Sequence, residues 1–305
     1  MAEAAPTAIA VLAGPTASGK TGLAVEVALR LGAEILSADS QQLYRGLDVG
    51  TAKPTPGERA AAPHHLLDLV EPGEGMDAAR WAALADDAIR AIAGRGRVPL
   101  VVGGTGLYLR ALLHGVVEAP GRDPVLRARL EADAERFGRA ALHARLAEVD
   151  PGAAARIRPN DLVRVIRALE IAEGGRTQSD LFAEHRFAPR RYRYRLLALD
   201  VPRPELHRRI EARARAIAAG GIVEEARALV ARFGPALPKL PIGYVDAVAC
   251  ARGEIDVAEL ARRIAADHRR YARRQLIWLR RERDLEWLSP PVDPGAVAEL
   301  CRTAP

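Results

Sequence analysis

The sequence predicts an α/β fold, in which a parallel β-sheet is flanked by helices and the chain carries a helical insertion. Four short apolar runs, bounded by glycine or aspartate, alternate with helical patterns, which is typical of buried parallel strands. The runs are residues 9–13, 34–38, 98–102 and 194–199. The interval between the last two runs is longer than a simple crossover needs, so we expect an inserted domain there.

Helical patterns occupy the intervals between these runs and the region after the fourth one. Apolar residues recur in them with the spacing of one helix face. The segments are 21–31, 78–93, 204–219, 223–233 and 258–281. This alternation predicts helices on both faces of the sheet. We expect the tail after Pro290 to be peripheral.

The long interval contains its own helix start and stop signals. Asp123-Pro124 supplies an N-cap and then a proline in the first turn. Asn160-Asp161 is a second start, and Gly174-Gly175 stops the helix that follows. The predicted division is a core of residues 1–120 and 191–305, with a helical insertion of residues 121–190.

Composition excludes several classes of protein. Of the 305 residues 49% are apolar and 28% charged, which excludes wholesale disorder. Two cysteines, Cys250 and Cys301, are too few for a disulfide scaffold or a cysteine-rich zinc module. No apolar stretch is long enough to span a membrane, and Met1–Thr7 lacks the basic start of a signal peptide. We therefore expect a cytoplasmic protein with no membrane partner.

Positive charge is concentrated in the second part of the chain. Residues 1–120 carry 10 basic and 13 acidic side chains, whereas residues 121–305 carry 35 and 26. This asymmetry favours a polyanionic partner for the second part. Because all but three of the basic residues are arginines, a general bias toward arginine explains the excess equally well.

The segment from Gly14 to Thr21 fits the phosphate-binding pattern G-x-x-x-x-G-K-[ST], follows a predicted strand and opens a predicted helix. Its glycines allow backbone N–H groups to point at phosphate oxygens, and the helix adds the positive end of its dipole. Lys20 adds a mobile positive charge, and the Thr21 hydroxyl can ligate Mg²⁺. The predicted site comprises Gly14, Pro15, Thr16, Ala17, Ser18, Gly19, Lys20 and Thr21. The fold is therefore expected to be P-loop NTPase-like, with a motif typical of nucleotide and ATP binding.

A kinase or hydrolase with this loop usually holds Mg²⁺ with a carboxylate at the end of a neighbouring strand. The third run ends in Gly103-Gly104-Thr105, with no acid. Asp39 follows the second run, on the same edge of the sheet as the phosphate loop. Its carboxylate could bind a metal through water, act as a general base or simply cap the next turn.

Three segments together carry a family resemblance: residues 14–21, Asp39-Ser-Gln-Gln-Leu-Tyr-Arg-Gly-Leu-Asp-Val-Gly-Thr-Ala-Lys-Pro54 and Val102-Gly-Gly-Thr-Gly-Leu-Tyr108. They strongly resemble the tRNA dimethylallyltransferases, also called tRNA isopentenyltransferases. Further matches lie at 156–170, 242–244 and 271–280. In order and spacing the resemblance covers roughly residues 7–290.

The resemblance implies transfer of a five-carbon prenyl group from dimethylallyl diphosphate to the exocyclic amine of an adenosine in tRNA. In this family the target adenosine is adjacent to the anticodon on its 3′ side. The phosphate loop would then hold the diphosphate leaving group with Mg²⁺, in a monomeric enzyme. This agrees with the missing carboxylate after the third run, because no γ-phosphate is attacked.

The resemblance also implies residue roles. Asp39 is similar to the family's general base, and Thr105 to a hydroxyl that contacts the reacting amine or the bridging oxygen of the diphosphate. Arg209 and Arg213 match a helix whose arginines close over the diphosphate. The stretches that contact tRNA in the family correspond to Asp39, Ser40, Gln41, Gln42, Thr105, Arg127, Val163, Arg164, Val165, Ile166 and Arg167. This sequence departs from the family at Val163, Val245 and Ile277, where glutamine, a basic residue and threonine are common.

Residues 262–281, placed on a helix, gather eight arginines on one side and apolar residues on the other. Such a row of guanidinium groups can follow a phosphate backbone, since arginine binds phosphate in bidentate fashion. We expect four of them to contact tRNA: Arg269, Arg270, Arg273 and Arg274. The alternative is an ordinary solvated face.

Two other functions are compatible with parts of the pattern. A small-molecule kinase of the P-loop class explains the strands and the loop, but not the helical insertion or the row of arginines. A non-catalytic RNA-binding ATPase explains the charge, but gives Asp39 and Thr105 no role.

Overall fold

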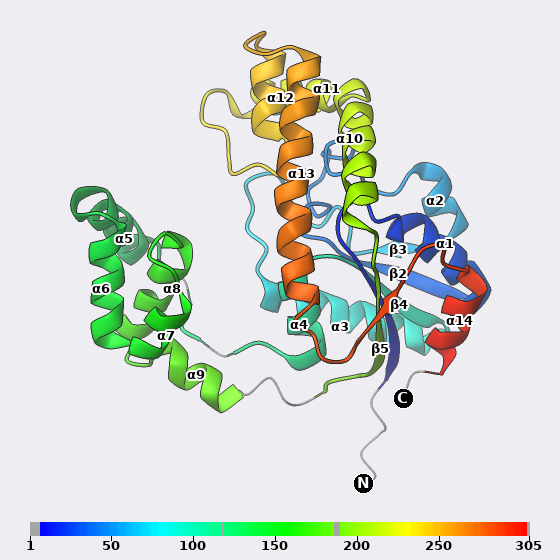
Figure 1. Ribbon diagram of the computed structural model, residues 1–305, viewed down its shortest axis with the longest axis horizontal. Helices are drawn as coiled ribbons and strands as arrows, with labels where there is room; N and C mark the ends of the chain where they lie inside the picture. Colours follow the sequence, from blue (N-terminus) through cyan, green and yellow to red (C-terminus); the bar gives the residue numbers. More distant parts are fainter. Residues whose placement is uncertain (1–6, 118, 122, 186–189, 304–305) are drawn as a thin grey trace. The chain divides into compact units, whose positions relative to one another are not determined.

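The computed structural model describes residues 7–117, 119–121, 123–185 and 190–303. It divides the chain into two compact units, one formed by Met1–Leu113 with Arg190–Pro305 and the other by His114–Pro189 (Figure 1). The insertion predicted at 121–190 starts later than the second unit. Residues 186–189 of the predicted insertion lie outside the described residues. So do residues 1–6, which belong to the segment expected not to be a signal peptide.

The first unit is built on a six-stranded parallel sheet with the order β3-β2-β4-β1-β5-β6. The strands are β1 (Ala8–Ala13), β2 (Ala33–Ala38), β3 (His64–His65), β4 (Val98–Gly103), β5 (Arg193–Leu199) and β6 (Leu285–Leu288). The four predicted strands are confirmed as β1, β2, β4 and β5, and so is the predicted fold class. The sequence did not reveal β3 and β6, since the first has two residues and the second is a half-exposed edge strand.

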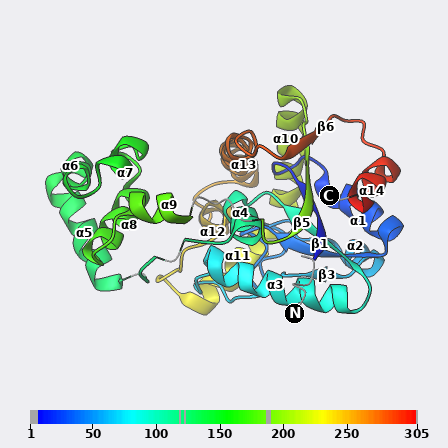
Figure 2. The same ribbon diagram turned by 90° about the horizontal axis from the view of Figure 1, so that it is seen from below.

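Helices cover both faces of this sheet (Figure 2). Those between the strands are α1 (Lys20–Leu31), α2 (Pro56–Ala61), α3 (Ala78–Gly94) and α4 (Gly106–His114). The C-terminal helix α14 (Pro294–Arg302) packs beside α1 and buries Val297, Ala298 and Cys301 in the core of that face. The expectation of a peripheral tail was therefore wrong, because these three residues form an apolar stripe on one helix face.

Four further helices stand at the end of the sheet where β5 leaves it (Figure 1). They are α10 (Arg203–Ala219), α11 (Ile222–Phe233), α12 (Tyr244–Ala251) and α13 (Val257–Leu279). Leu206 and Ile210 of α10 and Leu260 and Ile264 of α13 belong to one buried cluster. Burying each such side chain contributes about 1.5–3 kcal/mol to folding. The long helix α13 is thus fixed against α10.

The second unit is helical within its described residues. Its helices are α5 (Pro124–Phe137), α6 (Arg139–Val149), α7 (Pro151–Arg156), α8 (Leu162–Glu173) and α9 (Gln178–His185). The predicted start at Asp123 is confirmed, because its carboxylate accepts hydrogen bonds from the N–H groups of Val125 and Leu126. Leu130, Leu146 and Leu169 lie in its separate core. In the part of the chain that is described, no helix combines the length and the apolar character that crossing a membrane needs.

Candidate active site

Three strand ends meet at one edge of the sheet. In the strand register Gly103 of β4 lies between Ala13 of β1 and Ala38 of β2. A Cβ atom on Gly103 would lie 2.2 Å from the Ala38 carbonyl oxygen, so only glycine allows this approach. The phosphate loop after β1, the Asp39 turn after β2 and the Thr105 loop after β4 therefore start side by side.

The phosphate loop is a tight turn that leads directly into α1. The Ser18 N–H donates to the Pro15 carbonyl over 3.2 Å, and α1 starts at Lys20 without a side-chain cap. Gly19 and Ala17 both have left-handed backbones, with φ of 93° and 64°. Such a backbone is uncommon for alanine and is typically held in place at functional sites. The uncapped N–H groups at the start of α1 form an anion site.

A narrow cavity of about 30 Å³ opens beside this loop. Its lining includes Thr16, Lys20, Thr21, Asp39 and Arg213. One buried polar atom of this lining, Arg213 Nε, has no hydrogen-bond partner among the described atoms. Because buried donors are rarely left unpaired, it points to an anionic ligand.

Lys20 is the charged group at the centre of this cavity. Its side chain is 9% exposed, and Nζ lies 3.4 Å from the Pro15 carbonyl oxygen. Burial lowers the pKa of Lys20 from 10.5 to about 8; the Asp39 carboxylate opposes this shift and Arg213 adds to it. The ammonium group therefore loses its proton around pH 8, and a bound diphosphate would favour its charged form.

We expect diphosphate binding to take up protons above about pH 8. At pH 8.5 a fraction of Lys20 is neutral in the free protein and must be protonated in the complex, whereas at pH 7 most of it is already charged. Calorimetric titrations in two buffers of different ionisation enthalpy measure this uptake. Proton uptake that is equal at both pH values, or that persists in Lys20→Ala, would contradict it.

Asp39 and Thr105 lie on adjoining turns. Asp39 Oδ1 accepts from the Gln41 N–H over 2.9 Å, so this carboxylate does cap its turn. Its other oxygen accepts no hydrogen bond within the described part of the chain. The Thr105 hydroxyl oxygen accepts from the Ser40 N–H over 2.9 Å, so one turn positions both groups. Asp39 Oδ1 therefore caps the turn, and Asp39 Oδ2 remains available to accept a proton.

The arginines of α10 approach the phosphate loop as the resemblance implies. Arg209 Nη1 donates to the Ser18 carbonyl over 3.0 Å, and its Nε is held by Glu205 at 2.7 Å. Arg213, one turn further along α10, lines the cavity. Both guanidinium groups therefore add positive charge beside the phosphate loop, and their contact with a diphosphate remains a prediction.

Several residues expected to contact tRNA have internal partners. Gln42 bonds to the Ser37 hydroxyl and the Ala52 carbonyl, and Gln41 accepts from the Ile242 N–H over 3.0 Å. Their contacts with tRNA remain predictions, and the structure gives both side chains a role in fixing the Asp39 turn.

In the insertion the expected contacts divide into two groups. Val163 and Arg164 are exposed, but Val165 and Ile166 are buried in the unit's core, so their side chains do not reach a surface. Physically, the stretch is one turn and a half of an amphipathic helix, and only one face is accessible. Contacts of the exposed residues with tRNA remain predictions.

Arg127 and Arg167 have an internal partner in the buried carboxylate of Glu170. Arg127 forms a two-pronged ion pair with it, at 3.2 and 2.7 Å. Arg167 lies 3.6 Å from the same carboxylate and donates to the Pro120 carbonyl over 2.7 Å. Replacing Glu170 would leave the partly buried guanidinium groups of Arg127 and Arg167 without this carboxylate. The cluster therefore has a structural role that the sequence did not show.

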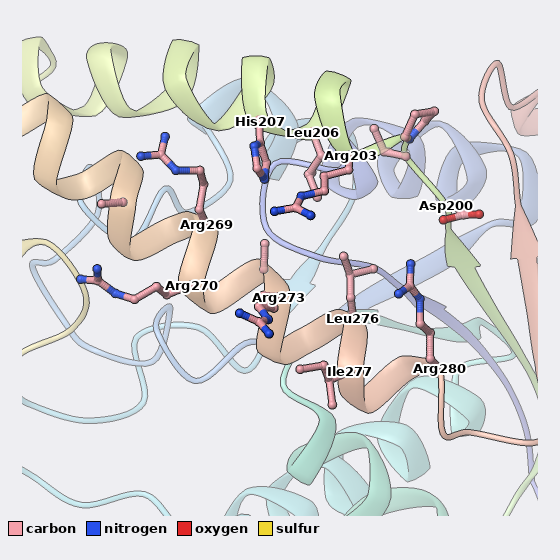
Figure 3. Close-up of a pocket in the computed structure, with 14 residues that line it drawn as sticks. Asp200, Arg203, Leu206, His207, Arg269, Arg270, Arg273, Leu276, Ile277 and Arg280 are labelled. Atoms are coloured by element: carbon pink, nitrogen blue, oxygen red, sulfur yellow. The ribbon is translucent and has the colours of Figure 1, made fainter.

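The row of arginines borders a groove of about 920 Å³ between α10 and α13 (Figure 3). Arg203 and His207 of α10 face Arg269 and Arg273 of α13 across it. α13 ends at Leu279, two residues before the predicted end, so the last two arginines follow the helix. This groove is larger than the cavity at Lys20, and one strand-end carboxylate, that of Asp200, lines it, but the phosphate loop, Asp39 and Thr105 are not part of its lining.

Ion pairs hold part of this row. Arg269 lies 3.3 Å from Glu211, and Arg270 pairs with Asp267. Exposed pairs of this kind contribute about 0–1 kcal/mol and exchange readily for phosphate. Among the described residues no carboxylate pairs with Arg273 or Arg274. Ion pairs thus neutralise part of the row, and the expected contacts of these arginines with tRNA remain predictions.

Glu225 is a positioning residue that sequence patterns did not indicate. Its carboxylate accepts from the N–H groups of Asp48 and Val49 at 2.8 Å and of Gly50 at 3.2 Å, and from the Tyr244 hydroxyl at 2.6 Å. A Cβ atom on Gly50 would lie 2.5 Å from the Tyr244 ring. This contact explains why glycine precedes Thr51 and ties the loop after the Asp39 turn to α11 and α12.

A P-loop at the carboxyl edge of a parallel sheet, with Asp39 and Thr105 beside it, defines an enzyme that acts on a phosphorylated substrate. Family models agree: the IPP transferase model matches residues 42–282 and the isopentenyl transferase model residues 7–69. The chain belongs to the tRNA dimethylallyltransferase family, whose members are prenyltransferases.

Similar proteins extend this result to nearly the whole chain. A tRNA dimethylallyltransferase of Anaeromyxobacter dehalogenans strain 2CP-C is 72% identical, over 95% of this chain and 97% of its own. The crystal structure of the tRNA isopentenylpyrophosphate transferase of Bacillus halodurans matches with a TM-score of 0.67 and 36% identity, over 97% and 95% of the two chains. A eukaryotic dimethylallyltransferase acting on tRNA matches with a TM-score of 0.76 and 25% identity, over 93% and 74%. These names favour the prenyltransferase over the kinase and the RNA-binding ATPase.

Proposed function

We propose that this protein transfers the dimethylallyl group of dimethylallyl diphosphate to the exocyclic amine of the adenosine 3′-adjacent to the anticodon of tRNA. The observation that carries the proposal is the single sheet edge that presents the phosphate loop, Asp39 and Thr105 together, with glycines in place of an acid after β4. The names of the relatives support the same substrate class.

The diphosphate binds at the phosphate loop. The Thr16 and Ser18 N–H groups have partners within the protein, which leaves those of Ala17, Gly19 and Lys20 for the ligand. Arg213 Nε, which lines the cavity and has no partner among the described atoms, supplies a further donor.

Magnesium fits this site through oxygen ligands. Among the described residues no group of three histidine, cysteine, aspartate or glutamate side chains could hold a metal by itself. Thr21 lines the cavity, and its hydroxyl oxygen suits Mg²⁺, which keeps several waters and shares phosphate oxygens. When bound, the ion would neutralise charge on the leaving diphosphate.

In the reaction a bond forms between the amine nitrogen and the terminal carbon of the allyl group, and the bond from that carbon to the diphosphate oxygen breaks. The electron pair of the broken bond leaves with the diphosphate, where Lys20 and the loop N–H groups stabilise it. Asp39 takes the proton that the amine loses. Thr105 orients the amine. No nucleotide is consumed.

The test is a reaction of the purified protein with tRNA, dimethylallyl diphosphate and Mg²⁺ and no ATP. We expect pyrophosphate release and a matching mass increase of one prenyl group on the tRNA, with ATP at most a weak competitor. An absolute requirement for ATP with release of ADP would overturn the proposal in favour of a kinase or ATPase. We infer that the enzyme acts as a monomer in the cytoplasm, and sedimentation of the purified protein tests the first part.

The arginine row should make tRNA affinity depend on salt. Each neutralised phosphate contributes a slope of roughly −0.7 to −0.9 in log affinity against log salt. Replacing Arg269, Arg270, Arg273 and Arg274 by alanine is expected to flatten this slope and weaken tRNA binding, while donor binding stays unchanged. Filter binding or fluorescence anisotropy over a salt series measures the effect.

The matched control compares two double variants, each of which removes two positive charges: one in the arginine row and one outside it. Arg227 and Arg232 are exposed on α11 and form surface ion pairs outside the row. Replacing both should change the slope much less than replacing Arg273 and Arg274, for which the described residues supply no carboxylate partner. Equal effects of the two double variants would show that net charge, and not this helix face, attracts the tRNA.

A further inference from the structure

Gln275 is a buried polar residue on the side of α13 that faces the sheet edge. Its side chain is 4% exposed, in a helix whose other buried residues, such as Ala272 and Leu279, are apolar with the exception of His268. Its Oε1 accepts from the Thr16 N–H over 2.8 Å, and its Nε2 donates to the Gly104 carbonyl over 3.1 Å. One amide therefore joins the phosphate loop to the segment that carries Thr105.

The space around this amide is closed. A Cβ atom on Gly104 would lie 2.2 Å from Gln275 Nε2 and 2.6 Å from the Gly14 carbonyl oxygen. The orientation of the amide is fixed as well, because the Thr16 N–H can only donate and the Gly104 carbonyl can only accept. Of the common side chains of this size, only a neutral amide or a protonated acid satisfies both partners.

Two more residues of α13 lie against the same segment, one turn on either side. The Tyr271 hydroxyl is 3.4 Å from the Thr105 hydroxyl, and the Trp278 ring packs where a Cβ atom on Gly106 would come within 2.1 Å. Residues spaced by four and three share one helix face. This face of α13 therefore holds the whole Gly104–Gly106 segment, while the arginine row occupies another face of the same helix.

We propose that Gln275 is a positioning residue that sets the separation between the phosphate loop and Thr105. It touches no reacting atom; it acts through Thr16 on the donor side and Gly104 on the amine side. The proposal rests on the proposed function, since the two sides must be held in register only if a donor diphosphate and an acceptor amine react between them. A misplacement of about 1 Å between reacting groups can cost about 10²-fold in rate.

Gln275→Glu is the decisive variant. At neutral pH its carboxylate still accepts from Thr16 but opposes the Gly104 carbonyl, and kcat is expected to fall about 10- to 100-fold. When protonated, the acid can donate to Gly104 and reproduce the amide. The ratio of variant to wild-type kcat should therefore rise as pH falls from about 7.5 to 5.5, because burial, the adjacent Gly104 carbonyl oxygen and the bound diphosphate all raise the pKa of a carboxyl group.

The controls separate positioning from stability. Gln275→Leu offers neither bond and should lower kcat at every pH without recovery, with the KM for tRNA little changed. Leu260→Ala, a buried truncation at the other end of α13, should lower the melting temperature and leave kcat near that of the wild type. Melting temperatures of all three variants are measured alongside the rates.

The outcomes distinguish the two proposals. Wild-type transfer together with a kcat ratio for Gln275→Glu that recovers at low pH supports the positioning role. Wild-type transfer with a ratio near one, or with a loss independent of pH, overturns it and leaves the proposed function intact. A wild-type protein that transfers no prenyl group overturns the proposed function and the role of Gln275 with it.

Discussion

The Asp39→Asn variant is expected to lose a factor of roughly 10²–10⁴ in kcat while its binding of dimethylallyl diphosphate stays nearly intact. The amine of adenine is a poor nucleophile because its lone pair is conjugated with the ring, so removing its proton as the new bond forms lowers the barrier. Asparagine keeps an acceptor for the Gln41 N–H, so the turn survives the change. Donor binding stays nearly intact, because the loss of a negative charge near the diphosphate is offset by a fall in the pKa of Lys20, which Asp39 raises.

The measurement is single-turnover prenyl transfer with saturating tRNA, together with a donor-binding titration. Asp200→Asn serves as the control, since Asp200 follows β5 at the same sheet edge but borders the groove between α10 and α13. Its kcat should stay close to the wild-type value. Near-normal turnover of Asp39→Asn would leave Asp39 with the capping role alone.

The central strands and the phosphate loop could be predicted because their signals are local. A buried parallel strand is a short apolar run, and the loop has a fixed spacing of glycine, lysine and threonine. β6 and α14 were missed or misjudged for the opposite reason. Each is stable only through contacts with distant parts of the chain: β6 pairs with β5, and α14 packs against α1.

The site shows the same division. Asp39 and Thr105 follow predicted strands, so their shared edge could be predicted from the rule that parallel strands end together. Gln275 and Glu225 act on segments far away in sequence, and their bonds are set by the packing of α13 and α11. One signal was present for Gln275: an uncharged polar residue on the apolar side of a predicted helix usually satisfies a buried partner.

In the insertion, the resemblance implies tRNA contacts for residues whose burial or internal partners only the structure shows. Val165 and Ile166 belong to a stretch aligned with tRNA contacts, but helical periodicity places them in the core. The sequence alone gives no ion-pair partner for Arg127, whereas in the structure Arg127 forms an ion pair with Glu170. Because Glu170 lies on the buried face of α8, only the packing of α5 on α8 reveals the pair.

The Lys20→Ala variant is expected to lose roughly 10²–10³ in kcat and to raise the KM for dimethylallyl diphosphate as well. The lysine charge attracts the diphosphate in the ground state, which sets part of KM. It also stabilises the additional negative charge that develops on the leaving group, which sets part of kcat. Both effects are enlarged because Lys20 is buried, where a charge interaction is screened less than in water.

The pH dependence of Lys20→Ala separates this role from simple loss of structure. In the wild type the KM for the donor should rise above about pH 8, because the free enzyme then holds a neutral Lys20 and binding must add a proton. The alanine variant should lose that rise and keep a high KM throughout. Steady-state rates from pH 6.5 to 9.5, at saturating tRNA and constant ionic strength, give both curves. Because Lys20 contributes to the anion site but not to RNA contacts, the KM for tRNA should be unchanged. A variant whose donor KM still rises above pH 8 would assign the titration to another group, and a variant with an unchanged kcat would place the leaving-group charge on the loop N–H groups and Mg²⁺ alone.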